Sequence, residues 1–286
     1  MKRPGILVAA GAGVLTLWAL APLYWVVVSS ISTRTELYAA PYKHWLPAHP
    51  TFANYVDVFT TGPRYRAGGF LPSATILASG LRNSLVIALT SAAVIALLAS
   101  LAGYVFARLR IRLKGVLFLA LLSLLPLPIW VSLISLYFLL SGVGLVDTDL
   151  GMILIFVAYG LPLYVWLMQT YIAGTPKEVE EAALMDGAGR VRALFQVVLP
   201  MARAGLVSVF LVAFLTTWNA FLIPLIFSNT EASQPLTVVL SLFIGQYEVA
   251  WEAMSAAAVV TMLPPVFLAL FFQRYLVRGL SMGALQ

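Results

Sequence analysis

The chain has 286 residues and a formal net charge of +6; 62% of its residues are hydrophobic and only 10% are charged. Soluble domains carry about 25% charged residues, so this composition excludes a soluble enzyme, a coiled coil and a disordered chain. It predicts a membrane protein, and because the basic residues lie between apolar runs they form no patch for nucleic acid.

Side chains that hold metals or form disulfides are scarce. The chain has no cysteine, and its two histidines, His44 and His49, lie in a polar, Pro-rich stretch without the spacing of a metal-binding pair. We therefore expect no metal site, no disulfide and no catalytic residue in this chain.

Six uncharged runs are long enough to cross a bilayer, whose hydrocarbon core of about 30 Å requires about 20 apolar residues. They comprise residues 4–33, 83–107, 115–146, 150–176, 204–230 and 253–273. These runs predict an all-α polytopic membrane protein with six transmembrane helices. The interval 232–247 is shorter and contains Gln234 and Pro235, so we expect a loop or a re-entrant segment there.

The first run continues through Pro22 and Val28, beyond the apolar region of about 7–15 residues found in a signal peptide. We therefore expect a retained first helix. With the polar, Pro-rich external segment that follows, this helix forms a first part over residues 1–82. A core transmembrane domain over 83–278 and a cytoplasmic tail over 279–286 complete the expected organisation.

The basic residues indicate orientation, because Lys and Arg favour the cytoplasmic ends of short loops. A cytoplasmic N-terminus places most of the basic residues inside, and both termini are then cytoplasmic. No ionisable residue lies within the six runs, which argues against a proton-driven or sodium-driven carrier. Prolines in the later runs predict kinks. They are Pro126, Pro128, Pro162, Pro224, Pro264 and Pro265.

The connection between the fourth and fifth runs carries helix signals. Thr175 is placed to cap a helix, Pro176 suits its first position, and Glu178 completes a capping box. Gly187 supplies a turn, and Pro200 limits a second helix that leads into the fifth run. The first helix would present a small apolar surface beside carboxylates, which suits either docking of a partner or a solvated linker.

This connection resembles the EAA signature of ABC importer permeases. The matching residues are Glu181, Ala182, Ala183, Gly187, Val197, Leu199 and Pro200, with Asp186 beside the glycine. In that family the loop docks into a cleft of a cytoplasmic ATPase subunit, so the resemblance implies that these residues couple the chain to an ATPase. It also implies the type I ABC importer permease fold.

Other stretches resemble the carbohydrate-type branch of this family, which includes the second membrane subunit of the maltose importer. They are residues 54–59, 102–108, 144–148, 218–221 and 272–280. Ala220 replaces a Glu that is frequent in the branch, and the tail after Leu280 departs from the usual ending.

The resemblance implies a permease subunit of an ATP-driven, binding-protein-dependent importer of a sugar or oligosaccharide, in the cytoplasmic membrane of a bacterium or an archaeon. The implied partners are a homologous permease, two copies of an ATPase subunit, an external solute-binding protein and the lipid bilayer, without nucleic acid. ATP and Mg²⁺ would bind to the ATPase, because this chain lacks a Gly-rich phosphate loop and is not expected to be an enzyme.

Other solutes and other classes of protein remain open at this point. The same architecture would serve glycerol phosphate, a polyamine or a peptide, and a secondary carrier or a membrane scaffold are more distant alternatives.

Candidate contacts with the solute lie in the fifth run, where Trp218, Asn219 and Phe221 combine aromatic faces, which stack on sugar rings, with an amide that bonds hydroxyls. Candidate contacts with the external binding protein are Gln234, Gln246 and Tyr247.

Overall fold

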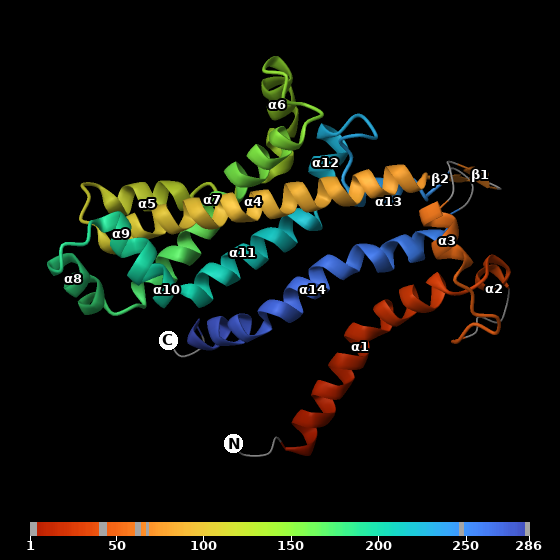
Figure 1. Cartoon of the computed structure of the whole chain (residues 1–286), viewed down its shortest axis with the longest axis horizontal. Helices are drawn as coiled ribbons and strands as arrows, with labels where there is room; N and C mark the ends of the chain where they lie inside the picture. The colour runs from red at the N-terminus through yellow and green to blue at the C-terminus, as the bar shows by residue number, and fades with distance from the viewer. Residues whose placement is uncertain (1–4, 40–44, 61–63, 67–68, 246–248, 284–286) are drawn as a thin grey trace. The chain divides into compact units, whose positions relative to one another are not determined.

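The computed structural model describes residues 5–39, 45–60, 64–66, 69–245 and 249–283, and these are almost entirely helical (Figure 1). The elements of the first half are α1 (Ile6–Ser30), α2 (Arg34–Tyr38), α3 (Ala53–Thr60), β1 (Arg64–Arg66), β2 (Gly69–Leu71), α4 (Ala74–Arg108), α5 (Lys114–Leu122) and α6 (Ile129–Gly142). The second half contains α7 (Asp149–Ala173), α8 (Lys177–Met185), α9 (Arg190–Ala193), the π-helical turn η1 (Leu194–Val198), α10 (Leu199–Met201), α11 (Arg203–Trp218), α12 (Leu222–Phe227), α13 (Leu236–Ser241) and α14 (Trp251–Gly283). The mostly helical class is confirmed, with one short antiparallel hairpin, β1–β2, as an addition.

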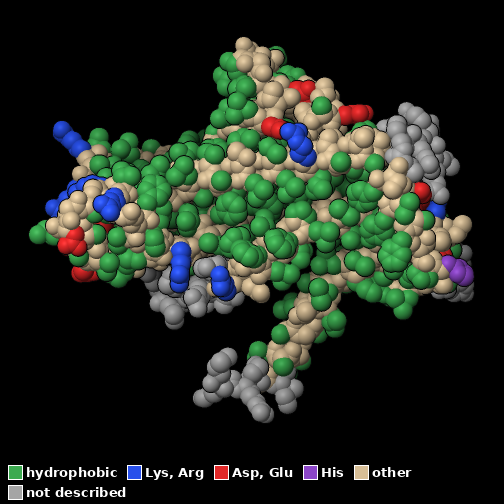
Figure 2. Space-filling view, in the orientation of Figure 1, with side chains coloured by type: hydrophobic (Ala, Val, Ile, Leu, Met, Phe, Trp, Pro, Cys, Tyr) green, Lys and Arg blue, Asp and Glu red, His purple; other side chains and the backbone are tan. Residues whose placement is uncertain are grey.

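Several helices have the length and the surface of transmembrane segments. Among the described residues four are long and apolar enough to cross a bilayer: Leu7–Ser30, Ala74–Arg108, Asp149–Ala173 and Trp251–Arg274. Figure 2 shows hydrophobic side chains over the long helices and charged side chains gathered at the end that carries α8 and α9. Large apolar side chains such as Trp18, which is 82% exposed, require a lipid solvent. The protein is therefore a multi-pass membrane protein.

The third and fifth apolar runs are interrupted rather than continuous. Residues 123–128 lie between α5 and α6, so the kinks predicted at Pro126 and Pro128 take the form of a break between two helices. Pro128 has an extended backbone before α6, and a proline cannot donate the backbone hydrogen bond that a continuing helix would need. The fifth run breaks between α11 and α12, and an 84° bend separates Arg190–Met201 from Arg203–Trp218.

One compact unit comprises Met1–Leu81 and Val238–Leu263. The Asn54 amide donates to the carbonyl oxygens of Ser30 and Ser32, each at 2.9 Å, and so ties α3 to the end of α1. The Arg34 guanidinium lies 3.9 Å from the Glu252 carboxylate in the same unit. These contacts fix part of the Pro-rich segment that follows the first helix.

The other compact unit comprises Arg82–Thr237 and Pro264–Gln286. Its long helices approach closely where glycines replace larger residues. A Cβ on Gly205 of α11 would lie 2.2 Å from Cγ of Tyr171 on α7, and one on Gly103 of α4 would lie 2.9 Å from Cβ of Met168. Both distances are shorter than carbon atoms tolerate, so these contacts of α7 with α11 and α4 require glycine at both positions.

A hydrophobic cluster in this unit joins α4, α6, α7 and α12. Its buried members are Ile87, Leu133, Leu140, Met152, Ile155, Phe156 and Phe227. The cluster packs the short helices α6 and α12 against the long ones, so the broken runs are held in place by packing.

Candidate functional site

The connection between α7 and α11 (the α7–α11 loop, residues 174–202) begins with the exposed helix α8. The helix starts at Lys177, and no side chain caps its N-terminus. The Thr175 hydroxyl instead donates to the carbonyl oxygen of Ile172 at 2.8 Å. The predicted capping box with Glu178 is therefore wrong, because the hydroxyl is engaged with the end of α7.

The C-terminus of α8 is closed by a glycine in a left-handed conformation. Gly187 has φ +85°, its N–H donates to the carbonyl oxygen of Leu184 at 3.1 Å, and the next N–H, of Ala188, donates to Ala183 at 3.0 Å. This pair of bonds is the Schellman arrangement, which satisfies the last helix carbonyls. The predicted turn at Gly187 is confirmed.

The exposed face of α8 combines apolar and acidic side chains. Met185 is 88% exposed and Val179 is 47% exposed, although both are apolar. The predicted coupling residues on this helix and its end are Glu181, Ala182, Asp186 and Gly187, all exposed, and Ala183, which is half-buried. The geometry therefore presents an apolar knob bordered by carboxylates, as a helix that enters a groove on another protein would.

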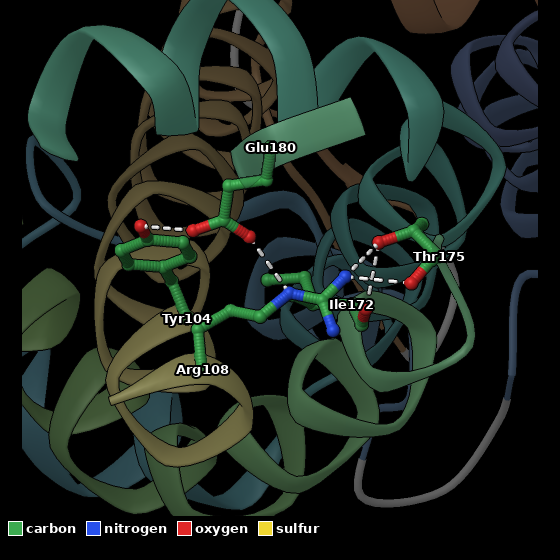
Figure 3. Close-up of polar contacts among 5 residues, drawn as sticks. All are labelled: Tyr104, Arg108, Ile172, Thr175 and Glu180. Atoms are coloured by element: carbon green, nitrogen blue, oxygen red, sulfur yellow. Dashed lines mark hydrogen bonds and ion pairs between the residues drawn. The ribbon is translucent and has the colours of Figure 1, made fainter. Parts of the chain in front are cut away.

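The opposite face of α8 carries a buried acid. Glu180 is 4% exposed, and its carboxylate accepts a hydrogen bond from the Tyr104 hydroxyl at 2.6 Å and forms an ion pair with Nε of Arg108 at 2.8 Å (Figure 3). Nη2 of Arg108 donates to both the carbonyl oxygen and the hydroxyl of Thr175, at 2.7 and 2.6 Å. These four residues, the Glu180 cluster, join α4, the end of α7 and α8.

The remaining predicted coupling residues lie at the bend that follows. Leu199 is buried, Val197 is half-buried and Pro200 is exposed. Leu199 and Pro200 also line a largely apolar groove of about 630 Å³. Its other lining residues are Ala93, Ala96, Leu97, Ser100, Phe195, Arg203, Leu206, Val207, Phe210 and Phe272. The structure thus separates the predicted set into an exposed part on α8 and a packing part at the bend.

The candidate solute residues lie at the break between α11 and α12. Trp218 is buried and stacks on Phe214 at a ring distance of 5.4 Å. Asn219 and Phe221 are exposed, although the Asn219 amide donates to the carbonyl oxygen of Leu215 at 2.8 Å. Trp218 is therefore part of the core in this conformation, and only the other two face the surface.

The segment after α12, residues 228–237, is fastened by two sets of polar contacts. The Asp147 carboxylate accepts bonds from the backbone N–H groups of Asn229 and Thr230 at 2.6 and 2.9 Å, and from the Ser233 hydroxyl. Burial alone would raise the pKa of Asp147, but hydrogen bonds from Ser233, Thr230 and Asn229 outweigh it and hold that pKa below its ordinary value.

The second set of contacts comes from α4. The Asn83 amide donates to the carbonyl oxygens of Ala232 and Gln234 at 2.7 and 3.3 Å, and the N–H of Leu236 donates to the Ser84 hydroxyl at 2.8 Å. Gln234, a candidate contact for a binding protein, is thus held through its backbone. The other two candidates, Gln246 and Tyr247, lie outside the described residues.

Neither Glu180 nor Asp147 was among the predicted site residues. The helical period offered a signal for Glu180, because it lies one turn before Leu184 and so on the face opposite the exposed apolar residues. For Asp147 a weaker signal was its place in a Gly-Leu-Val-Asp-Thr turn, where its φ is +63°, a conformation that Asp adopts more readily than most residues.

Long apolar helices, together with shorter apolar helices and a loop that carries an exposed helix, define the class as a helical multi-pass membrane protein. Residues 97–282 match the family described as binding-protein-dependent transport system inner membrane component. The chain belongs to this family, and it is a permease subunit of the ABC importer type. Family membership sets aside the secondary carrier and the scaffold.

Relatives match over nearly the whole chain. The trehalose/maltose transport system permease protein MalG of Thermococcus litoralis is 31% identical over 288 residues, covering 100% of this chain and 98% of that protein. The diacetylchitobiose uptake system permease protein NgcG of Streptomyces coelicolor is 31% identical, covering 96% and 88%. The sulfoquinovosyl glycerol transport system permease protein SmoH of Agrobacterium fabrum is 30% identical, covering 96% and 92%.

A solved structure shares the fold. It is a chain of a bacterial ABC transporter involved in the import of the acidic polysaccharide alginate, with a TM-score of 0.79. The match covers 95% of this chain and 96% of that chain at 20% identity. The importer permease fold that the sequence predicted is therefore confirmed.

Proposed function

We propose that this chain forms one membrane half of an ATP-driven importer for a sugar or an oligosaccharide. The observation that carries the proposal is the α8 surface, where Met185, Val179 and Ala182 are exposed beside Glu181. Such an apolar surface in water is unfavourable unless a partner covers it. The partner in this proposal is an ATPase subunit, one copy for this chain and a second copy for a homologous permease.

The proposed work cycle divides the tasks between subunits. ATP and Mg²⁺ bind to the ATPase, and this chain supplies no catalytic residue. Closure of the ATPase dimer moves α8, and the helices of the two permeases then rock between outward-open and inward-open arrangements. An external binding protein delivers the solute to the outer side, where residues 228–237 would contribute to the contact.

The proposed topology has six membrane passages and both termini in the cytoplasm of a bacterial or archaeal cell. Four passages are the long apolar helices, a fifth is α11 with α12, and the sixth is the broken pair α5 and α6. The rule that Lys and Arg favour the cytoplasmic side supports this orientation, because Arg190, Arg192 and Arg203 then lie inside with α8.

The proposed solute is a carbohydrate because several relatives are named for carbohydrate transport. Asn219 and Phe221 are exposed at the break between α11 and α12 and would line the pathway. An amide satisfies hydroxyls and an aromatic ring stacks on a sugar face.

Uptake into proteoliposomes tests the proposal. The complex is purified with its natural partners and reconstituted with the external binding protein, and labelled oligosaccharides are screened. We expect uptake that requires ATP and persists when ionophores collapse the ion gradients. Uptake of a polyamine or a peptide instead of any sugar would overturn the substrate class, and uptake independent of ATP would overturn the importer.

A further inference from the structure

The Glu180 cluster joins the α7–α11 loop to α4 through charges that are removed from water. Glu180 and Glu252 are the buried acids among the described residues, and only Glu180 has a cation within 3 Å, Nε of Arg108 at 2.8 Å. The exposed fractions of the Arg108 and Glu180 side chains are 4% and 6%. A pair of charges this far from solvent is screened little by salt.

Stability alone does not account for such a cluster. Burying an ion pair carries a desolvation penalty, and apolar side chains of the same volume often hold helices together equally well. Polar contacts add direction. Nη2 of the Arg108 guanidinium donates hydrogen bonds to Thr175, and Nε forms an ion pair with one carboxylate oxygen of Glu180. The Tyr104 hydroxyl, one helical turn away, donates a hydrogen bond to the other carboxylate oxygen. The position of α8 relative to α4 is thereby fixed at several points.

Glycines lie on both sides of α8. Gly174 precedes the helix, and Gly187 and Gly189 follow it. Glycine backbones have more accessible conformations than other residues, so these flanking segments transmit force poorly. The Glu180 cluster bypasses them and connects α8 directly to a long, continuous helix.

The far end of that helix holds a different part of the protein. From Arg108 back to Asn83, α4 spans about 37 Å at 1.5 Å per residue. Asn83 and Ser84 bind the backbone of residues 232–236 at that end. A displacement of α8 that moves Tyr104 and Arg108 would therefore be carried along α4 to the segment after α12.

We propose that the Glu180 cluster is the link through which α8 drives α4, with Glu180, Tyr104 and Arg108 as positioning residues for transport. This inference rests on the proposed function, in which α8 meets an ATPase. The exposed face of α8 then holds the ATPase, and the buried face passes the motion on. Loss of the cluster leaves the ATPase bound but separates ATP hydrolysis from solute movement.

The test uses the intact complex with Tyr104→Phe, Glu180→Gln and the double variant. Tyr104→Phe removes one oxygen atom and keeps the ring, so it remains informative where Glu180→Gln assembles poorly. Three quantities are measured on each folded complex: the ATPase retained per copy of this chain, the rate of ATP hydrolysis, and the solute moved per ATP. Tyr164→Phe is the matched control, because Tyr164 is also buried and gives a single side-chain bond, to the Thr216 hydroxyl at 3.3 Å.

We expect each cluster variant to retain the ATPase and to move about fivefold less solute per ATP, a usual size for coupling between sites. The double variant should lose less than the product of the two single losses, because both residues act through one carboxylate. Asn83→Ala, at the far end of α4, should lower the same ratio. Tyr164→Phe should leave the ratio at the wild-type value.

An unchanged ratio of solute to ATP in folded Tyr104→Phe and Glu180→Gln complexes would overturn the link, as would an equal fall in Tyr164→Phe. A wild-type chain that retains no ATPase would overturn the proposed function, and the link with it. The two failures are therefore distinguished by the first of the three quantities.

Discussion

Gly187 ends α8 with a backbone conformation that other residues adopt at a cost. Its φ is +85°, and a Cβ added there would meet no atom within 4 Å, so the penalty for Gly187→Ala is backbone strain alone, about 1–2 kcal/mol. We expect the variant to insert normally and to lose solute uptake relative to ATP hydrolysis. Both rates are measured in the same vesicles after quantifying the subunit.

Gly189→Ala provides the control for this experiment. Gly189 has φ −69° and also has open space around an added Cβ, so alanine is accommodated there without strain. Equal losses in the two variants would contradict the role of the left-handed turn.

Asp147 acts on the segment after α12 through an ionised carboxylate. Its folded pKa is lowered, so its stabilisation is complete above the ordinary Asp pKa of about 3.9 and is lost as the pH falls through the lower folded pKa. Asp147→Asn keeps the shape and tolerates φ +63°. We expect it to cost about 1 kcal/mol at pH 7, a small value because the carboxylate is partly exposed to water.

The pH dependence separates charge from shape at this site. The difference in unfolding midpoint between wild type and Asp147→Asn should be constant down to a pH of about 4 and should narrow below it, because the wild-type carboxyl then takes up a proton. A difference that stays constant below that pH as well would contradict the electrostatic explanation.

At the scale of elements, α7 and α11 pack closely because Gly205 has no side chain. An alanine Cβ there would lie 2.2 Å from Cγ of Tyr171, so the helices must separate. We expect Gly205→Ala to lower stability by about 1–3 kcal/mol, measured as the thermal midpoint of the detergent-solubilised protein. Gly115→Ala in α5, where nothing lies within 4 Å of the added Cβ, should leave it unchanged or slightly raised.

A second substitution checks the cause. Tyr171→Ala removes the ring that an alanine at Gly205 would strike. The double variant should therefore be more stable than the sum of the two single losses of stability predicts. Strictly additive effects would contradict a direct clash between α7 and α11.

The elements that the sequence predicted well are those set by long apolar stretches, such as α1, α7 and α14, because the need to bury apolar surface in lipid fixes their position. Prediction from the sequence failed where a polar group can form its hydrogen bond with more than one partner. The sequence predicted kinks at Pro126 and Pro128 but not the separation of α5 from α6 there, and the Thr175 hydroxyl donates to Ile172 rather than capping α8. The Thr175 hydroxyl has two local partners to choose between, because Ile172 lies only three residues before it in the chain, and the spacing of the residues does not decide between them.

The candidate site also divides into residues that the sequence predicted and residues that it did not. Glu181 and Gly187 were predicted from their pattern, because an exposed helix and its turn are local features. The role of Glu180 depends on Arg108 and Tyr104, which are more than 70 residues away in the sequence. The spacing of residues within α8 does not predict either contact. The exposed face of α8 was therefore predictable, whereas for the buried face the helical period indicated the position of Glu180 but not its partners.

At the scale of the whole molecule, the described residues combine features that act together in transport. The described residues leave the outer face of α8 uncovered. The Glu180 cluster attaches this helix to α4, and α4 in turn holds the segment after α12. In the proposed complex, one chain converts the movement of a partner into a change at its own far end.

The most direct test of this account is the native mass of the gently extracted complex, with the identity and stoichiometry of its subunits. The account predicts one copy of this chain, one homologous permease and two copies of a nucleotide-binding subunit. Recovery of the chain alone or as a homo-oligomer, under conditions that preserve other membrane complexes, would contradict it.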